Sequence, residues 1–99
     1  MVNQEESIVI SNLVQRYTMV MDNAKAPATF MHDPQNSFSD HHLRWMLFTL
    51  LQNLQTHDFP WKATRYHRWL GFIQCALIGR QYTTVNDERD ATREMLNGY

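Results

Sequence analysis

The sequence has few residues that cross-link or interrupt a chain. Its one cysteine, Cys75, excludes an intramolecular disulfide and any zinc site built on paired cysteines. Three glycines and three prolines favour helices over the many turns of a β-sandwich. No apolar run reaches the roughly 20 residues that a membrane-spanning helix requires, and the opening MVNQEES lacks the basic residues of a secretory signal. We therefore expect one domain, residues 1–99, in a reducing cytoplasm and away from membranes.

Signatures of catalysis and of metal binding are also missing. No two histidines share the four-residue spacing that places two imidazoles on one metal, and no HExxH motif occurs. Cys75 lies about 12 Å along a helix axis from His67, which is too far for a nucleophile–base pair. We interpret the histidines as surface residues and Cys75 as a small core residue. The expectation is a protein without enzyme activity, catalytic residues, metal or cofactor.

Charge is nearly balanced over the whole chain, with a formal net charge of −1. Residues 1–58 carry three basic and six acidic side chains, and residues 59–99 carry six basic and four acidic ones. The two halves therefore have net charges of −3 and +2. This modest asymmetry differs from the strongly basic surface by which many proteins attract nucleic acids.

Apolar residues recur at three- and four-residue spacing in four stretches, which predicts four helices. We expect these helices at residues 3–22, 38–56 and 59–80, and from about Thr84 onward. Residues 23–37 contain two prolines and show no period, so they form a long loop. The short link that follows the second helix predicts an antiparallel hairpin of the second and third helices. The predicted fold class is all-α, a small four-helix domain with a central antiparallel helical hairpin.

Single residues predict further details of the last two helices. Pro60 suits the first turn of the third helix, where its missing N–H is not needed. Gly71 costs about 1 kcal/mol relative to alanine inside a helix, so we expect another helix to approach it closely. Thr84 is expected to cap the last helix, with Val85 facing the core and Glu88 on the charged outer face.

Candidate partner-binding residues lie in the 23–37 loop and on the basic face of the third helix. The loop is interpreted either as a functional loop or as a mobile connector whose apolar residues fold back onto the core. The basic face is either a solvated surface, a surface that binds phosphates and stacks on bases, or a match for acids on another protein. The candidates are Lys25, Phe30, Met31 and His32 in the loop and Trp61, Lys62, Arg65 and Arg68 in the helix, with Arg80 extending the basic face.

The segment RWLGFIQCALIGRQYTTVNDERDATR, residues 68–93, resembles a group of small tailed-bacteriophage proteins. Cys75 stands where the pattern of that group has glycine. The resemblance implies a phage origin and a helical fold, and it implies no activity, because the group has no established one. The matching positions are Trp69, Leu70, Gly71, Phe72, Ile73 and Gln74, then Tyr82-Thr83-Thr84 and Asp87-Glu88-Arg89.

Three functional hypotheses follow from these features. The first is a non-enzymatic phage accessory protein that binds and inhibits a host protein or defence complex in the host cytoplasm. The second is a nucleic-acid or nucleotide-binding module that uses the basic helix face. The third is a structural homo-oligomer whose interface comes from the leucine-rich second helix. The first hypothesis is preferred, because aromatic and methionine residues suit an adaptable protein-binding surface.

Overall fold

The computed structural model describes residues 3–56 and 61–95. In these two ranges the backbone forms four α-helices and one short 3₁₀-helix, with no β-strand. The prediction of a small all-α domain is confirmed. None of the helices in these ranges is long and apolar enough to cross a membrane. The elements are α1 (Gln4–Asn23), the 3₁₀-helix η1 (Pro34–Asn36), α2 (Asp40–Gln55), α3 (Ala63–Gly79) and α4 (Val85–Met95).

Side-chain caps explain where two of the helices begin. Asn3 precedes α1, and its Oδ1 accepts a hydrogen bond from the backbone N–H of Glu6 at 2.8 Å. Thr84 precedes α4, and its Oγ1 accepts from the backbone N–H of Asp87 at 3.1 Å, which is the cap that the sequence predicts. In each case one of the four unpaired N–H groups of a helix start gains a partner.

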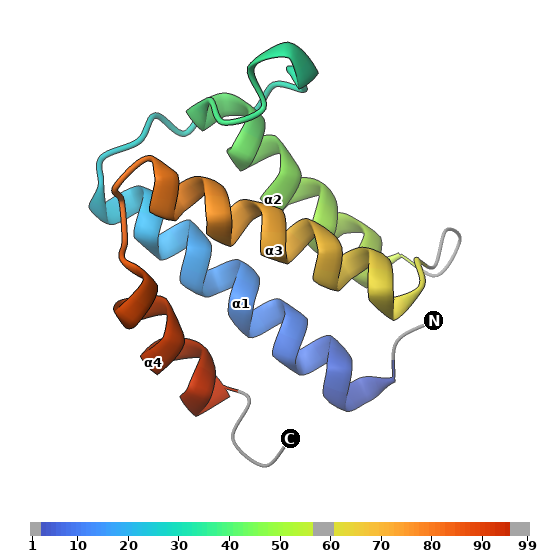
Figure 1. Ribbon diagram of the computed structural model, residues 1–99. Helices are drawn as coiled ribbons and strands as arrows, with labels where there is room; N and C mark the ends of the chain where they lie inside the picture. Colours follow the sequence, from blue (N-terminus) through green and yellow to red (C-terminus); the bar gives the residue numbers. More distant parts are fainter. Residues whose placement is uncertain (1–2, 57–60, 96–99) are drawn as a thin grey trace.

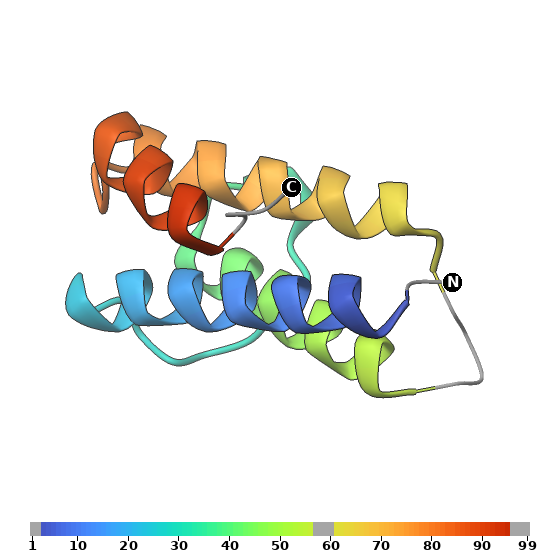
Figure 2. The same cartoon turned by 90° about the horizontal axis from the view of Figure 1, so that it is seen from below.

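Helix α1 makes the main contacts with all three other helices. α2 and α3 also contact each other and run in opposite directions, so they form the predicted hairpin, and α1 packs across it (Figure 1). α4 packs beside α1 and follows α3 through a short turn (Figures 1 and 2). The inward stripes meet in one core, whose large members are Ile10, Leu13, Tyr17, Met21, Leu43, Leu47, Leu50, Tyr66, Leu70, Ile73 and Leu77.

Helix α3 differs from its prediction at its start and on its outer face. It begins at Ala63, and the start predicted at residues 59–60 lies outside the described residues. Gly71 is exposed, and a Cβ added there would meet no described atom within 4 Å, so the predicted close approach of another helix is wrong. Cys75 is exposed rather than buried, because the inward stripe passes through Ile73 and Ala76 on either side of it.

Helix α4 is attached through a charge rather than through an apolar stripe. Glu88, predicted on the outer face, is 2% exposed and forms an ion pair of 2.8 Å with Arg16 of α1. Thr83 donates a second hydrogen bond to the same carboxylate oxygen at 2.6 Å. Val85, predicted inside, is 53% exposed. Both predictions are wrong, because a hydrophobicity pattern assigns every carboxylate outward and cannot anticipate an arginine waiting on another helix.

Candidate partner-binding groove

The first half of the loop between α1 and α2, residues 24–39, is held against α2 by one buried arginine. The guanidinium of Arg44 is 5% exposed and donates to the carbonyl oxygens of Ala26 at 2.8 Å and Pro27 at 3.3 Å. It also forms an ion pair of 2.8 Å with Asp22 near the end of α1. Three charge-assisted contacts on one side chain join the end of α1, the loop and α2.

The second half of the loop is held by a histidine pair at the start of α2. The backbone N–H of Met31 donates to the carbonyl of His41 at 3.0 Å, and that of Asp33 donates to Nδ1 of His42 at 2.9 Å. The Asp33 carboxylate lies 2.8 Å from Nε2 of His41 and accepts from the side-chain amide of Asn36 at 3.2 Å. The loop is therefore a folded element over the start of α2, which decides against the interpretation of a mobile connector.

Under this loop, a groove runs between α2 and α3. It is an open cavity of about 640 Å³. The loop contributes one wall, and the two helices contribute aromatic rings, a methionine and two arginines. No described acidic residue lines it. The lining residues are His32, Pro34, Ser37, His42, Trp45, Met46, Arg65, Arg68, Trp69 and Phe72.

The groove is bordered by a continuous row of rings, which we call the aromatic wall: His32, Trp45, Trp69 and Trp61. Successive ring centroids lie 4.3, 5.8 and 4.7 Å apart, with tilts between the planes of 32°, 39° and 57°. These tilted contacts are favourable arrangements for aromatic pairs. The wall contains all three tryptophans of the chain. Residues distant in sequence thus form one apolar surface.

Two arginines of α3 stand beside the aromatic wall. Arg65 and Arg68 are three residues apart, so they lie on the same face of the helix, and both are exposed. The guanidinium of Arg65 lies 4.3 Å from the Trp61 ring centroid, within the range of a cation–π contact. Neither arginine forms an ion pair with any residue in the described ranges. The groove therefore combines an apolar wall with positive charge that the described chain does not neutralise.

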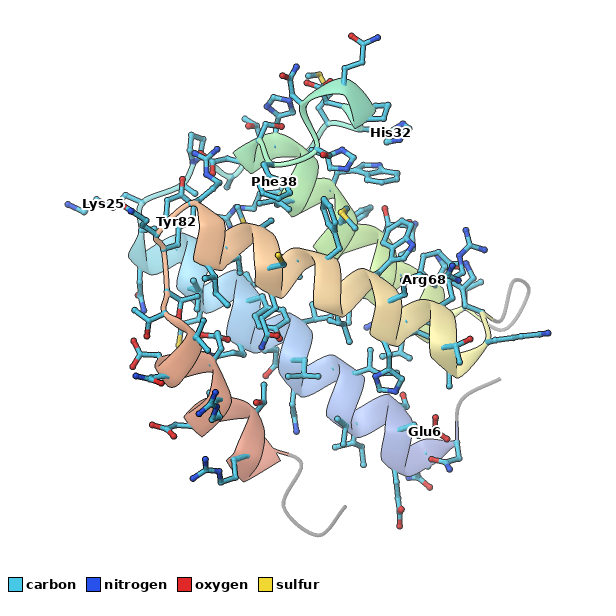
Figure 3. All side chains as sticks on the ribbon, in the orientation of Figure 1. Glu6, Lys25, His32, Phe38, Arg68 and Tyr82 are labelled. Carbon is cyan, nitrogen blue, oxygen red and sulfur yellow. The ribbon has the colours of Figure 1, made fainter. Side chains whose placement is uncertain are left out.

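The structure brings together some of the sequence-predicted site residues and separates others. His32 of the loop and Arg65 and Arg68 of α3 line the same groove, and Trp61 belongs to its wall. Figure 3 shows His32 above the helices and Arg68 at the side of α3. Lys62 is the exposed N-cap of α3 and does not line the groove.

Three predicted loop residues lie elsewhere on the surface. Lys25 is exposed just after α1, at the end of the molecule away from Arg68 (Figure 3). Phe30 and Met31 are each 52% exposed, and the Phe30 ring packs against Phe48 of α2 with centroids 5.6 Å apart. None of the three lines the groove.

Arg80 has a structural task at the end of α3. It donates to the carbonyl of Phe38 at 3.0 Å and to the hydroxyl of Tyr82 at 2.8 Å, and it pairs with Asp40 at 3.3 Å. Tyr82 in turn donates to Asp40 at 2.7 Å. These contacts join the end of α3 to the start of α2, so Arg80 is not part of the groove.

Sequence reasoning missed half of the lining. Trp45 lies at the edge of the apolar stripe of α2, and Trp69 and Phe72 lie at the edge of that of α3, where residues are half-buried. Large aromatics at stripe edges on neighbouring helices were the available signal. His42 was interpreted as a surface residue but is 6% exposed. Its burial lowers its pKa below the ordinary value of 6.5, which keeps the ring neutral while Nδ1 accepts the Asp33 N–H.

The groove is a recognition surface rather than a catalytic centre. No group of three or more histidine, cysteine, aspartate or glutamate side chains among the described residues could hold a metal ion. His42, the one buried titratable residue of the lining, uses its free nitrogen to hold the loop. Comparison with protein families, curated proteins and solved structures gives no significant match for this chain. A functional assignment therefore depends on the chemistry of the groove.

Proposed function

We propose that this chain is a non-enzymatic binding protein whose groove between α2 and α3 receives part of a partner protein. The observation that carries the proposal is the meeting of Arg65 and Arg68 with the aromatic wall in one groove. Tryptophan and arginine are the residue types most enriched among those that dominate binding energy at protein interfaces. Trp45 and Trp69 are half-buried, so each is positioned by packing and still offers ring surface to a partner.

In biological context, the protein acts as a phage accessory protein that inhibits a host protein or defence complex in the host cytoplasm. The support for this is the resemblance of residues 68–93 to small tailed-bacteriophage proteins. Two of the matching positions, Trp69 and Phe72, line the groove. Inhibition then requires only that the bound segment of the host protein is one that the host needs free.

A second candidate is a module that binds nucleic acid or a nucleotide through the same arginines. Exposed guanidinium groups beside aromatic rings are a combination that also binds single strands. Two observations weigh against it: the net charge of the chain is −1, and only two cations line the groove. Nucleic-acid affinity comes chiefly from many phosphate contacts and falls steeply with salt.

The test is affinity capture from bacterial lysate with and without nuclease, using a charge-reversal pair and a matched control. Arg65→Glu with Arg68→Glu should abolish capture of a stoichiometric protein partner that survives nuclease. Arg89→Glu with Arg93→Glu makes the same charge change on exposed positions of α4, which contributes no residue to the groove, and should retain it. Loss of all captured material after nuclease would transfer the assignment to nucleic acid. Equal capture by both variants would contradict the groove as the binding surface.

A further inference from the structure

The lining of the groove specifies the chemistry of its ligand. We infer that it binds an acidic peptide segment, which places one large apolar side chain on the aromatic wall and carboxylates on Arg65 and Arg68. The inference rests on the proposed function and narrows it, because it names the class of protein segment that the groove receives.

Charge complementarity supplies the first part of the inference. Arg65 and Arg68 are separated by one helical turn, about 4.5 Å along the axis, and no described acid lines the groove. The described acids nearest the loop and the start of α2 are already engaged, Asp33 with His41 and Asp40 with Tyr82. A carboxylate matches the planar guanidinium fork in a bidentate contact. Two arginines one turn apart suit two carboxylates that are also one turn apart.

The shape of the aromatic wall supplies the second part. Trp45 is in contact with His32 on one side and Trp69 on the other, at centroid distances of 4.3 and 5.8 Å. The guanidinium of Arg65 covers the Trp61 ring at 4.3 Å. The rings thus use much of their faces on each other and on Arg65, and they leave tilted apolar surface rather than free parallel platforms. Stacking of successive bases requires such free faces, whereas an aliphatic or aromatic side chain packs on a tilted surface.

The size and rigidity of the groove fit a short segment. Its volume of about 640 Å³ lies within the range of sites that enclose small ligands. The loop wall is held by hydrogen bonds from Asp33 to His42 and from Met31 to His41. A groove formed in advance lowers the entropy cost of binding. An amphipathic helix with its apolar face in a groove is an established mode of peptide recognition.

The test is a selection from a randomised peptide library of about 12 residues, long enough for three helical turns. The library is selected on the full chain, on Arg65→Gln with Arg68→Gln, and on the control Arg89→Gln with Arg93→Gln. Enriched peptides are then titrated while the tryptophan emission is recorded. All three tryptophans belong to the aromatic wall, so the emission reports directly on the groove.

We expect enriched peptides to carry carboxylates three or four positions apart beside a leucine, phenylalanine or tryptophan. Each arginine-to-glutamine change should weaken binding about tenfold, as for a charge-assisted pair, and the α4 control should bind like the wild type. Replacing the peptide carboxylates by amides should cost about the same, and the two changes together should cost less than their sum. This coupling identifies the carboxylate–arginine contacts themselves.

Other outcomes separate this inference from the proposed function. Enrichment of peptides without carboxylates, bound equally by the glutamine variant, would overturn the acidic ligand and leave a protein-binding groove. Enrichment of no peptide would overturn both proposals. In that case, quenching of the tryptophan emission by a thymidine oligonucleotide would establish the nucleic-acid alternative.

Discussion

Two residues hold a backbone conformation that favours glycine. Lys25 follows α1 with φ of 60°, and Gln81 follows α3 with φ of 63°. In both places the next N–H bonds back to a carbonyl of the last helical turn, from Ala26 to Met21 and from Tyr82 to Leu77, each at 3.0 Å. This is the Schellman helix end, whose left-handed position is most often glycine.

Lys25→Gly should therefore stabilise the protein by about 0.5–1 kcal/mol, since relief of the left-handed strain outweighs the added freedom of the unfolded chain. The matched control is Lys25→Ala, which removes the same charge and keeps the strain. Urea denaturation should rank glycine above both alanine and lysine. Partner capture should be unchanged in both variants, because Lys25 does not line the groove. Loss of capture would return Lys25 to the binding surface.

Gly71→Ala should stabilise α3 by about 1 kcal/mol, the difference in helix propensity between the two residues. The added methyl group meets no described atom within 4 Å, so no packing cost opposes the gain. For a domain of this size the melting temperature should rise by about 4–8 °C. A lower melting temperature would show that another surface approaches Gly71 in solution.

At the scale of the element, α4 depends on the buried carboxylate of Glu88. Removal of one partner from a buried ion pair leaves the other partner uncompensated. Arg16 is 22% exposed and retains some water, so we expect Glu88→Gln to cost about 2–3 kcal/mol, below the range for fully buried pairs. Asp87→Asn removes the same charge at an exposed neighbouring position and should cost less than about 0.5 kcal/mol.

The Glu88 effect should also be local. Amide hydrogen exchange should show α4 losing protection before α1 and α3, because the contacts of α4 are mainly with α1. Uniform loss of protection across all helices would contradict the view that Glu88 acts by attaching α4. Replacement of both partners, Arg16→Met with Glu88→Leu, should recover most of the lost stability.

The loop of residues 24–39 should respond to acid. Burial lowers the pKa of His42, with smaller contributions from the nearby His32 and His41 that lower it and from Asp33 that raises it. The hydrogen bond with His41 chiefly lowers the pKa of Asp33. For both groups the unfolded state binds protons more readily than the folded state, so acid favours unfolding. The contribution of His42 is complete above its ordinary pKa of 6.5 and is lost as the pH falls below it.

Denaturation at roughly pH 7.5 and pH 5 measures this contribution, since the interval spans the ordinary histidine pKa and lies above that of Asp33. The wild type should be less stable at the lower pH, and His42→Gln should reduce the difference. His67→Gln is the control, because His67 is exposed on α3 and bonds to no part of the loop. An unchanged pH difference in His42→Gln would assign the acid sensitivity to other groups.

At the scale of the whole molecule, the helices were predictable and the groove was not. Apolar spacing located α1, α2 and α3 because their inward stripes are regular, with residues such as Leu43, Leu47 and Leu50 fully or nearly fully buried. The aromatic wall joins His32, Trp45 and Trp69 from three elements, and only tertiary packing decides that their rings meet. The anchoring of α4 failed for the same reason, since Glu88 is buried by a partner distant in sequence.

The same packing bears on association. The leucines of α2 that a structural oligomer would use lie inside the domain, with Leu43 and Leu50 at 0% exposure. The exposed large apolar residues of the described ranges are spread over several elements, and the only exposed apolar ring pair on α2 is Phe30 with Phe48. One such pair is small against the area that a stable dimer buries.

We therefore expect a monomer of 11.8 kDa in light scattering. Phe48→Gln removes the exposed ring of α2 without touching the core and should leave this mass unchanged. A doubled mass that Phe48→Gln returns to that of the monomer would instead make the Phe30–Phe48 surface a dimer interface and favour the structural hypothesis. A doubled mass that Arg65→Glu with Arg68→Glu returns to that of the monomer would identify the groove's ligand as an acidic segment of a second copy.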